Sequence, residues 1–147
     1  MKAPDFTLES ANGPVSLHDY LGKSPVVLYF YPKDETPVCT KEACGFRDNM
    51  EAFRGLQAVI IGVSADSVDS HKEFATKHNL PFILLSDKDN AVRKLYGVGK
   101  SFGVLPGRTT FVIGKDGVVK KVFSNEFEAD KHVQEALASL KRDSTSQ

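Results

Sequence analysis

Where a strand pattern gives way to a helix pattern, the chain reads Pro32-Lys33-Asp34-Glu35-Thr36-Pro37-Val38-Cys39-Thr40-Lys41-Glu42-Ala43-Cys44, and this stretch holds both cysteines of the protein. A cysteine in the first turn of a helix lies beside unpaired backbone N–H groups and the positive end of the helix dipole, and both favour the thiolate. Because the thiolate is the nucleophilic form of the side chain, we interpret Cys39 as a reactive thiolate and Cys44 as its partner.

The segments on either side of this stretch predict a strand and a helix. Residues Val26–Tyr31 are apolar or aromatic throughout, which is typical of a strand buried in the middle of a sheet. After Cys39, apolar residues recur at helical spacing up to a stop at Gly55; these are Phe46, Met50 and Phe53. Sites in open α/β sheets lie at the carboxyl ends of strands, and Cys39 falls at such an end.

Turn and cap signals divide the rest of the chain. A hairpin is predicted around Asn12-Gly13-Pro14, with a short helical turn over 18–21. Further strands are predicted over 57–63, 82–85, 108–113 and 118–123. Further helices are predicted over 68–78 and 128–140, and another helix follows a cap at 87–90 and runs to Tyr96. This order predicts a single α/β domain over 1–147 with the thioredoxin-like fold: a central mixed sheet flanked by helices, with an extra N-terminal β-hairpin. A flexible tail is expected over 142–147.

Composition excludes several classes of function. The chain has 19 Lys plus Arg and 19 Asp plus Glu in 147 residues, so its net charge is zero with His neutral. This balance argues against a strong attraction to nucleic acid or to an anionic membrane. The apolar runs are too short to span a bilayer. The chain does not begin with a positively charged segment followed by an apolar one, so no secretory signal is expected. Two close cysteines in this setting favour redox or metal chemistry over a disulfide scaffold.

The cysteine pair has other interpretations. From spacing alone, two buried structural thiols fit equally well. A zinc site would need two more ligands, and the four histidines show no ligand-type pairing; they are His18, His71, His78 and His132. General disulfide oxidoreductases favour a C-x-x-C motif, which is absent. The glycine-rich loop at 97–107 has no Walker or dinucleotide pattern.

The residues near Cys39 suit an attack on a peroxide, which requires a stabilised thiolate, donors for the leaving oxygen and exclusion of water. Thr36 offers a hydroxyl, and Pro32 fixes the loop and shields one side of the pocket. Arg108 is our candidate for the permanent cation, although composition does not select it over Arg47, Arg54 or Arg93. Glu42 is interpreted as a helix-dipole carboxylate without a catalytic part.

The spacing of Cys39 and Cys44 has a geometric consequence. Five residues along a helix advance about 7.5 Å and turn about 140° past a full turn, which separates the two Cα atoms by about 8.6 Å. A disulfide requires about 4.4–6.8 Å. We therefore predict that the two cysteines bond only after the first turns of the helix unwind.

The run from Tyr29 to Cys44 resembles the active site of a peroxiredoxin of the Q type, also called the bacterioferritin-comigratory-protein type, an atypical 2-Cys peroxiredoxin. The similarity continues through 3–8, 84–87 and 105–113 and reaches Lys131-His132. The resemblance implies that Cys39 is the peroxidatic and Cys44 the resolving cysteine. It implies further that the peroxide pocket is completed by three other residues, which are Thr36, Pro32 and Arg108.

The resemblance also implies an activity. Such an enzyme reduces hydrogen peroxide and organic hydroperoxides through a sulfenic acid and an intramolecular disulfide, which thioredoxin or a related dithiol protein recycles. It uses no metal, haem or flavin. A thiol redox sensor with little turnover is the alternative. We expect a monomer in the cytoplasm, or in the chloroplast if a transit peptide was removed. Val38 departs from the family pattern, where this position is usually Gly. Its β-branched side chain is expected to narrow the loop or the pocket entrance, which leaves the range of substrates open.

Overall fold

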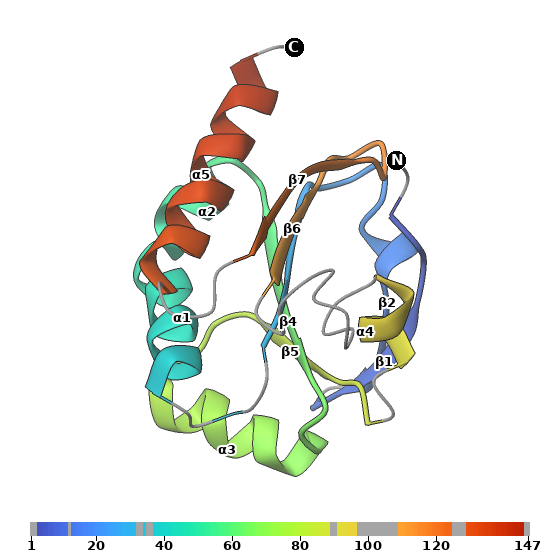
Figure 1. The fold of residues 1–147 in the computed structure, drawn as a ribbon, viewed down its shortest axis with the longest axis vertical. Coiled ribbons are helices and arrows are strands. Elements are labelled where there is room, and N and C mark those ends of the chain that lie inside the picture. Colours follow the sequence, from blue (N-terminus) through green and yellow to red (C-terminus); the bar gives the residue numbers. More distant parts are fainter. Residues whose placement is uncertain are drawn as a thin grey trace.

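The computed structural model describes residues 3–11, 13–31, 34, 37–88, 91–96, 109–124 and 129–145. Seven strands form one mixed sheet in the order β2-β1-β5-β4-β3-β6-β7 (Figure 1). The strands are β1 (Thr7–Ser10), β2 (Gly13–Ser16), β3 (Val26–Phe30), β4 (Val59–Ser64), β5 (Ile83–Ser86), β6 (Thr109–Ile113) and β7 (Val119–Ser124). The predicted mixed sheet and the N-terminal hairpin of β1 and β2 are confirmed.

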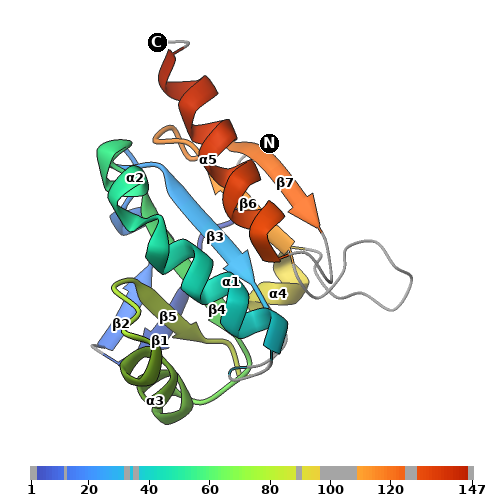
Figure 2. The same cartoon turned by 90° about the vertical axis from the view of Figure 1, so that its left-hand side faces the viewer.

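Helices cover both faces of the sheet. They are η1 (Leu17–Asp19), α1 (Pro37–Asp48), α2 (Met50–Gly55), α3 (Val68–His78), α4 (Ala91–Leu95) and α5 (Ala129–Thr145). Helices α1 and α5 lie side by side on one face, while α4 lies on the other (Figure 2). None of the helices that the structure describes combines the length and apolar character needed to span a bilayer.

Strand β3 is the centre of the core. It pairs in parallel with β4 and antiparallel with β6, and all five of its side chains are 0% exposed. Because side chains alternate along a strand, Val27 and Tyr29 join the hydrophobic cluster under α1, α3 and α5, while Leu28 and Phe30 join the cluster on the opposite face. The prediction of a central strand that is apolar on both faces is confirmed.

Helix α3 forms where its end signals predict. Ser67 lies at its N-cap, where its Oγ accepts a hydrogen bond from Ser70 N at 3.1 Å. At its other end Asn79 adopts the left-handed conformation, with φ of 52°, which ends the helix. Phe74 points into the core, at 1% exposure.

The predicted helix from Cys39 to Gly55 is wrong in one respect, because the structure breaks it into α1 and α2 at Asn49. Asn49 leaves helical geometry at φ of −108° and ψ of 12°, and its side-chain amide donates to Gly45 O at 2.8 Å. An asparagine amide competes in this way with the backbone for helix carbonyls. The apolar spacing continues across the break, which is why periodicity alone did not reveal it.

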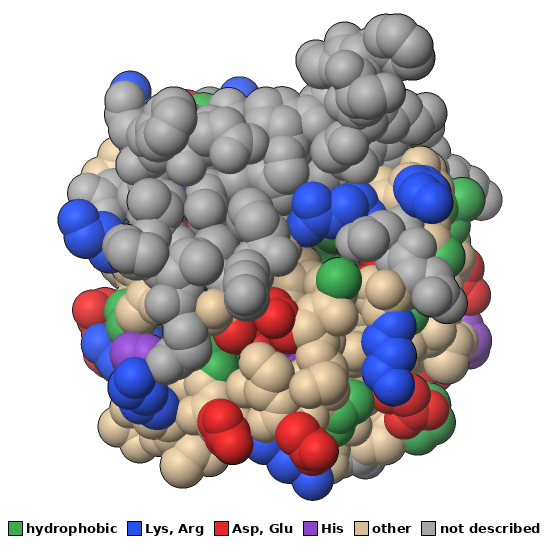
Figure 3. Space-filling model, turned by 60° about the horizontal axis from the view of Figure 1, so that its bottom comes forward, with side chains coloured by type: hydrophobic (Ala, Val, Ile, Leu, Met, Phe, Trp, Pro, Cys, Tyr) green, Lys and Arg blue, Asp and Glu red, His purple; other side chains and the backbone are tan. Residues whose placement is uncertain are grey.

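Other boundaries move by a few residues. The second central strand begins at Val59 instead of Gln57, because Gln57 takes a positive φ of 60° after α2. The last helix runs to Thr145, so the predicted end at Leu140 is too early, and the helix includes part of the segment for which the sequence favours a tail. On the face shown in Figure 3, the coloured atoms show acidic and basic side chains interspersed, in keeping with the charge balance of the chain.

Candidate active site

Cys39 is the third residue of α1, which begins at Pro37. The helix follows β3, whose last residue is Phe30, so the predicted position of Cys39 in the first turn of a helix after the central strand is confirmed for the backbone. The side chain of Cys39 lies outside the described residues, as do Pro32, Thr36 and Arg108. Their roles remain predictions from the sequence.

Cys44 lies in the same uninterrupted helix as Cys39. It is a free cysteine with a partly exposed side chain. The predicted helix between the two cysteines is therefore present, and regular helical geometry gives a Cα separation of about 8.6 Å, which is too long for a disulfide.

Close to the end of α1, Arg47 donates to His78 O at 2.6 Å and so links this end of the helix to α3.

Glu42 lies between the two cysteines and points into the protein. Its Oε2 atom is 3.4 Å from Nδ1 of His132 in α5, and both side chains are 0% exposed. The same His132 nitrogen is 2.7 Å from Thr110 Oγ1 on β6. The interpretation of Glu42 as a helix-dipole carboxylate stays a prediction, and the structure adds that the side chain is buried between α1 and α5.

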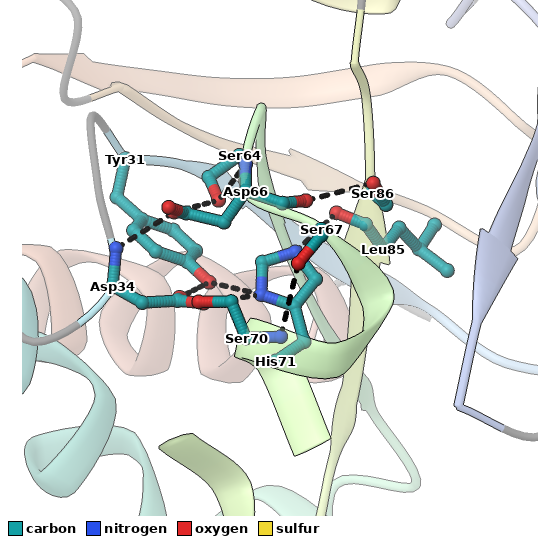
Figure 4. A network of polar contacts seen from close by, with 9 residues as sticks. All are labelled: Tyr31, Asp34, Ser64, Asp66, Ser67, Ser70, His71, Leu85 and Ser86. Carbon is teal, nitrogen blue, oxygen red and sulfur yellow. Dashed lines mark hydrogen bonds and ion pairs between the residues drawn. The ribbon is translucent and has the colours of Figure 1, made fainter. Parts of the chain in front are cut away.

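Asp34 is the centre of a buried polar network beside the start of α1 (Figure 4). Its carboxylate accepts three hydrogen bonds: Oδ1 from the Tyr31 hydroxyl at 2.5 Å, and Oδ2 from Ser70 Oγ at 2.8 Å and from His71 Nδ1 at 2.7 Å. The side chains of Asp34 and His71 are 1% and 2% exposed. The network thus joins the end of β3 to the first turn of α3.

The backbone of Asp34 has a partner of its own. Its N–H donates to Asp66 Oδ2 at 2.7 Å, and the same oxygen accepts from Ser64 Oγ at 2.7 Å. The carbonyl of Asp66 accepts from Ser86 Oγ at 2.7 Å. Strands β4 and β5 therefore hold Asp66 in the position where it binds the Asp34 backbone.

The network changes the acidity of its members. Burial alone would raise the pKa of Asp34, but hydrogen bonds from His71, Tyr31 and Ser70 and the charge of His71 outweigh it and hold the pKa below its ordinary value. Burial, with the nearby Tyr29 and the Asp34 carboxylate, raises the pKa of Tyr31 well above its usual range. Asp34 is therefore a carboxylate, and Tyr31 a neutral hydroxyl donor, at neutral pH.

The structure describes the surroundings of the three arginines that composition did not distinguish from Arg108. Arg93 of α4 donates from Nη2 to Tyr31 O at 2.7 Å, which fixes the backbone directly before Pro32. Arg47 binds His78 O and, through Nε, Asp48 at 3.0 Å. Arg54 is exposed. Arg93 thus contacts the chain leading to Cys39 through the carbonyl of Tyr31.

Among the described residues, ligand atoms of Asp34, Asp66 and His71 lie within 4.8 Å of one another, a spacing that would suit a metal ion. Each residue is engaged by a hydrogen bond inside the network, however, since Asp34 accepts from His71 and Asp66 accepts from the Asp34 N–H. The three side chains therefore form a hydrogen-bonded cluster that holds the chain at Asp34. Neither cysteine belongs to this cluster.

Sequence reasoning missed the network and the contact between Glu42 and His132. His71 is 37 positions from Asp34, and His132 is further still from the cysteines, so no local pattern joins them. One signal was available: His71 lies three residues before Phe74 on the face of α3 that the apolar pattern places inside. A histidine on a buried helix face requires polar partners.

Comparison with known proteins places the chain in a family. The model of the AhpC/TSA family matches residues 1–122. The chain belongs to this family. Curated relatives include peroxiredoxin Q, chloroplastic, from Sedum lineare, 55% identical over 139 residues (93% of this chain and 74% of the relative). The protein of the same name from Arabidopsis thaliana is 57% identical over 141 residues, or 95% of this chain and 65% of the relative. The chain thus spans about three quarters of the first relative and about two thirds of the second.

Solved structures agree with this assignment. Peroxidoxin BcpB from Mycobacterium tuberculosis is 41% identical, with a TM-score of 0.88 over 97% of this chain and 95% of that one. The Xanthomonas campestris bacterioferritin comigratory protein, whose structures concern alkyl peroxide reduction, is 33% identical with a TM-score of 0.84 over 94% and 91%. The predicted thioredoxin-like fold and the resemblance to Q-type peroxiredoxins are confirmed. The chain is a peroxiredoxin, an enzyme of the thiol peroxidase class.

Proposed function

We propose that Cys39 is the peroxidatic cysteine and that it reduces hydrogen peroxide and organic hydroperoxides. The observation that carries the proposal is the position of Cys39 in the first turn of α1, after the buried central strand, in a chain whose relatives are peroxiredoxins. The first turn of a helix offers free N–H groups and the positive end of the dipole, and both lower the free energy of a thiolate.

The first step is a displacement at oxygen. The Cys39 thiolate attacks the terminal oxygen of the hydroperoxide, an S–O bond forms, and the O–O bond breaks with its electron pair moving to the leaving oxygen. That oxygen takes a proton and departs as water or an alcohol, and Cys39 remains as a sulfenic acid. Thr36, Pro32 and Arg108 complete the pocket in this proposal; a hydroxyl and a guanidinium are the donors that a developing oxyanion requires.

The second step requires Cys44. Its thiolate attacks the Cys39 sulfur, an S–S bond forms, and the hydroxyl leaves as water after protonation. Because both cysteines lie in one continuous helix, the first turns of α1 must unwind before the sulfurs meet. A dithiol reductant, which we propose to be thioredoxin, then supplies two electrons and two protons and restores both thiols.

Two variants test the assignment. Cys39→Ser should abolish oxidation by one equivalent of hydroperoxide, whereas Cys44→Ser should keep the first oxidation and fail to recycle with thioredoxin. Since the chain has no tryptophan, rapid quenching with thiol labelling and mass spectrometry is the suitable measurement. A first oxidation that survives the loss of Cys39 would overturn the proposal. Sustained consumption of peroxide with thioredoxin separates a peroxidase from a redox sensor with little turnover.

Two further features of the proposal have direct tests. The Xanthomonas campestris relative is described as having alkyl peroxide reduction activity, which supports organic hydroperoxides as substrates here. Val38 should restrict bulky ones, so Val38→Gly should raise the rate with cumene hydroperoxide more than the rate with hydrogen peroxide. Equal changes for both substrates would show that Val38 does not limit access.

The compartment and the assembly are also proposals. Relatives named chloroplastic favour the chloroplast alternative over the cytoplasm, which immunolocalisation in the source cell would test. We propose a monomer, as Q-type peroxiredoxins often are. Light scattering of the reduced protein at several concentrations would detect a dimer.

A further inference from the structure

The chain leading to Cys39 has a fixed point at Asp34, five residues before the cysteine. Asp34 is held through its side chain by Tyr31, directly after β3, and by α3, and through its backbone N–H by Asp66 (Figure 4). Directly before Pro32, Arg93 binds the carbonyl of Tyr31. Several separate elements of the protein therefore contact this short part of the chain.

The ring of His71 lies between two hydrogen-bond acceptors. Its Nδ1 faces Asp34 Oδ2 at 2.7 Å, while its Nε2 faces the carbonyl oxygen of Leu85 at 3.0 Å. Both partners are acceptors, so both nitrogens must carry hydrogen if both bonds are made. The pattern is satisfied by an imidazolium that donates to the Asp34 carboxylate and to β5. This is an ion pair with almost no exposure to solvent.

Such a pair is sensitive to the loss of either partner. Removing one member of a buried ion pair leaves an uncompensated charge without water, which costs far more free energy than the loss of an exposed pair. The Asp34 carboxylate also has no spare partner in the network to replace His71, because its other hydrogen bonds come from Tyr31 and Ser70. The pair therefore keeps Asp34 in one position instead of several.

We propose that Asp34 and His71 are positioning residues for the peroxidatic cysteine. They fix the chain between β3 and α1, and with it the place of the Cys39 thiolate relative to the peroxide. The proposal rests on the assignment of Cys39 under the proposed function. Displacement of a reacting group by about 1 Å can reduce a rate by about a hundredfold, so an anchor five residues away affects the chemistry without touching substrate.

The proposal also sets a limit to the rearrangement of α1. When the first turns unwind to bring Cys44 to Cys39, the contacts of Asp34 to α3 and to Asp66 do not involve α1 and need not break. The part of the chain that rearranges is then limited on its N-terminal side by Asp34. The helix can rewind from a fixed starting point once the disulfide is reduced.

Substitutions at His71 separate the two bonds of the ring. His71→Asn places an N–H near the position of Nδ1 and keeps a donor for Asp34, whereas His71→Gln places one near Nε2 and keeps the donor for Leu85. Both remove the charge. In a Cys44→Ser background, which isolates Cys39, we expect His71→Gln and Asp34→Asn to slow oxidation by hydrogen peroxide by about tenfold to a hundredfold. We expect His71→Asn to retain more of the rate than His71→Gln.

A second reaction distinguishes positioning from a general loss of structure. Alkylation of Cys39 by iodoacetamide has no peroxide to align, so it should slow by less than about threefold in the same variants. Tyr31→Phe removes one donor to Asp34 and keeps the ring, so it provides a milder variant should those at His71 fail to fold. The matched control is His18→Gln, which alters an exposed pair whose Nδ1 lies 3.0 Å from Asp5 Oδ2, and it should leave both rates unchanged.

The outcomes separate the two proposals. If Asp34→Asn, His71→Gln and Tyr31→Phe fold like the parent and react with peroxide within twofold of its rate, the positioning role is wrong while the peroxidatic role of Cys39 stands. An equal loss in the peroxide and iodoacetamide reactions would also overturn positioning, because it indicates a changed thiol and not a changed alignment. If the parent itself reacts as fast after Cys39→Ser, the proposed function fails.

Discussion

Glu42 of α1 and His132 of α5 face each other across a helix interface, with Glu42 Oε2 3.4 Å from His132 Nδ1 and both side chains fully buried. Because Glu42 lies between Cys39 and Cys44, this contact belongs to the part of α1 that has to unwind for the disulfide to form. It stabilises the wound helix and therefore opposes the second step of the proposed reaction.

Weakening the contact between Glu42 and His132 should accelerate that step. Glu42→Gln weakens a contact that exists only in the wound helix, so the barrier to unwinding should fall and the disulfide should form several times faster after oxidation. The free energy of unfolding should fall by about 1–3 kcal/mol. Urea denaturation and quenched-flow thiol labelling measure the two effects. As a control, Glu135→Gln alters a partly exposed contact with Lys121 at 3.6 Å and should change stability by less than about 1 kcal/mol. Slower disulfide formation in Glu42→Gln would contradict this account.

Asp34 should make stability depend on pH in acid. Its pKa in the folded protein lies below the ordinary 3.8, so its stabilising contribution is complete above about pH 4 and is lost as the pH falls through the folded value. Asp34→Asn should therefore be less stable than the parent by about 3 kcal/mol at pH 7, and the difference should shrink below pH 3.8. Urea denaturation of both proteins from pH 7 to pH 3 provides the comparison. A difference that stays constant over this range would show that the charge of Asp34 is not stabilising.

Gly62 on β4 is required by close packing. A Cβ at this position would lie 2.7 Å from Tyr29 Cζ and 2.9 Å from Leu84 Cδ2, both in the buried cluster. Gly62→Ala should therefore lower the free energy of unfolding by about 1–3 kcal/mol. Gly55→Ala at the end of α2 is the matched substitution, because nothing lies within 4 Å of its Cβ, and it should leave stability unchanged or slightly raised. Equal effects at both glycines would refute the packing argument.

Phe46 connects α1 to the sheet. It is 0% exposed, and its ring stacks on that of Tyr29 with centroids 4.8 Å apart. Phe46→Ala should destabilise the protein by about 3–5 kcal/mol, as other large-to-small substitutions of buried aromatic residues do. Thermal or urea unfolding measures the loss. A cost below about 1 kcal/mol would show that α1 contributes little to the stability of the reduced protein.

The sequence predicted the elements whose signals are local. A run of apolar residues at 26–31 indicated β3, and a capping serine with helical periodicity indicated α3 at its observed bounds. The stretch around Cys39 predicted a helix start because a strand pattern gives way there to apolar residues at helical spacing. These features depend on neighbours within one or two turns.

The features that could not be predicted from the sequence depend on distant residues, or on competition between a side chain and the backbone for hydrogen bonds. Nothing near Asp34 predicts a partner in α3, and nothing near Glu42 predicts His132. Asn49 breaks the helix through its own amide, although the apolar pattern of Phe46, Met50 and Phe53 is unchanged across it. Periodicity records which face is buried and does not record whether the backbone ladder is continuous.

The break at Asn49 has a consequence for every turnover. Helix α1 has its own hydrogen-bond ladder, which ends at Asp48, and the Asn49 side chain occupies the carbonyl of Gly45. Loss of structure that begins near Cys39 therefore meets a boundary before Met50 and Phe53, which remain packed in the core with α2. In the proposed cycle the unwinding is therefore confined to this one short helix, and Met50 and Phe53 stay packed as part of the surface on which it forms again.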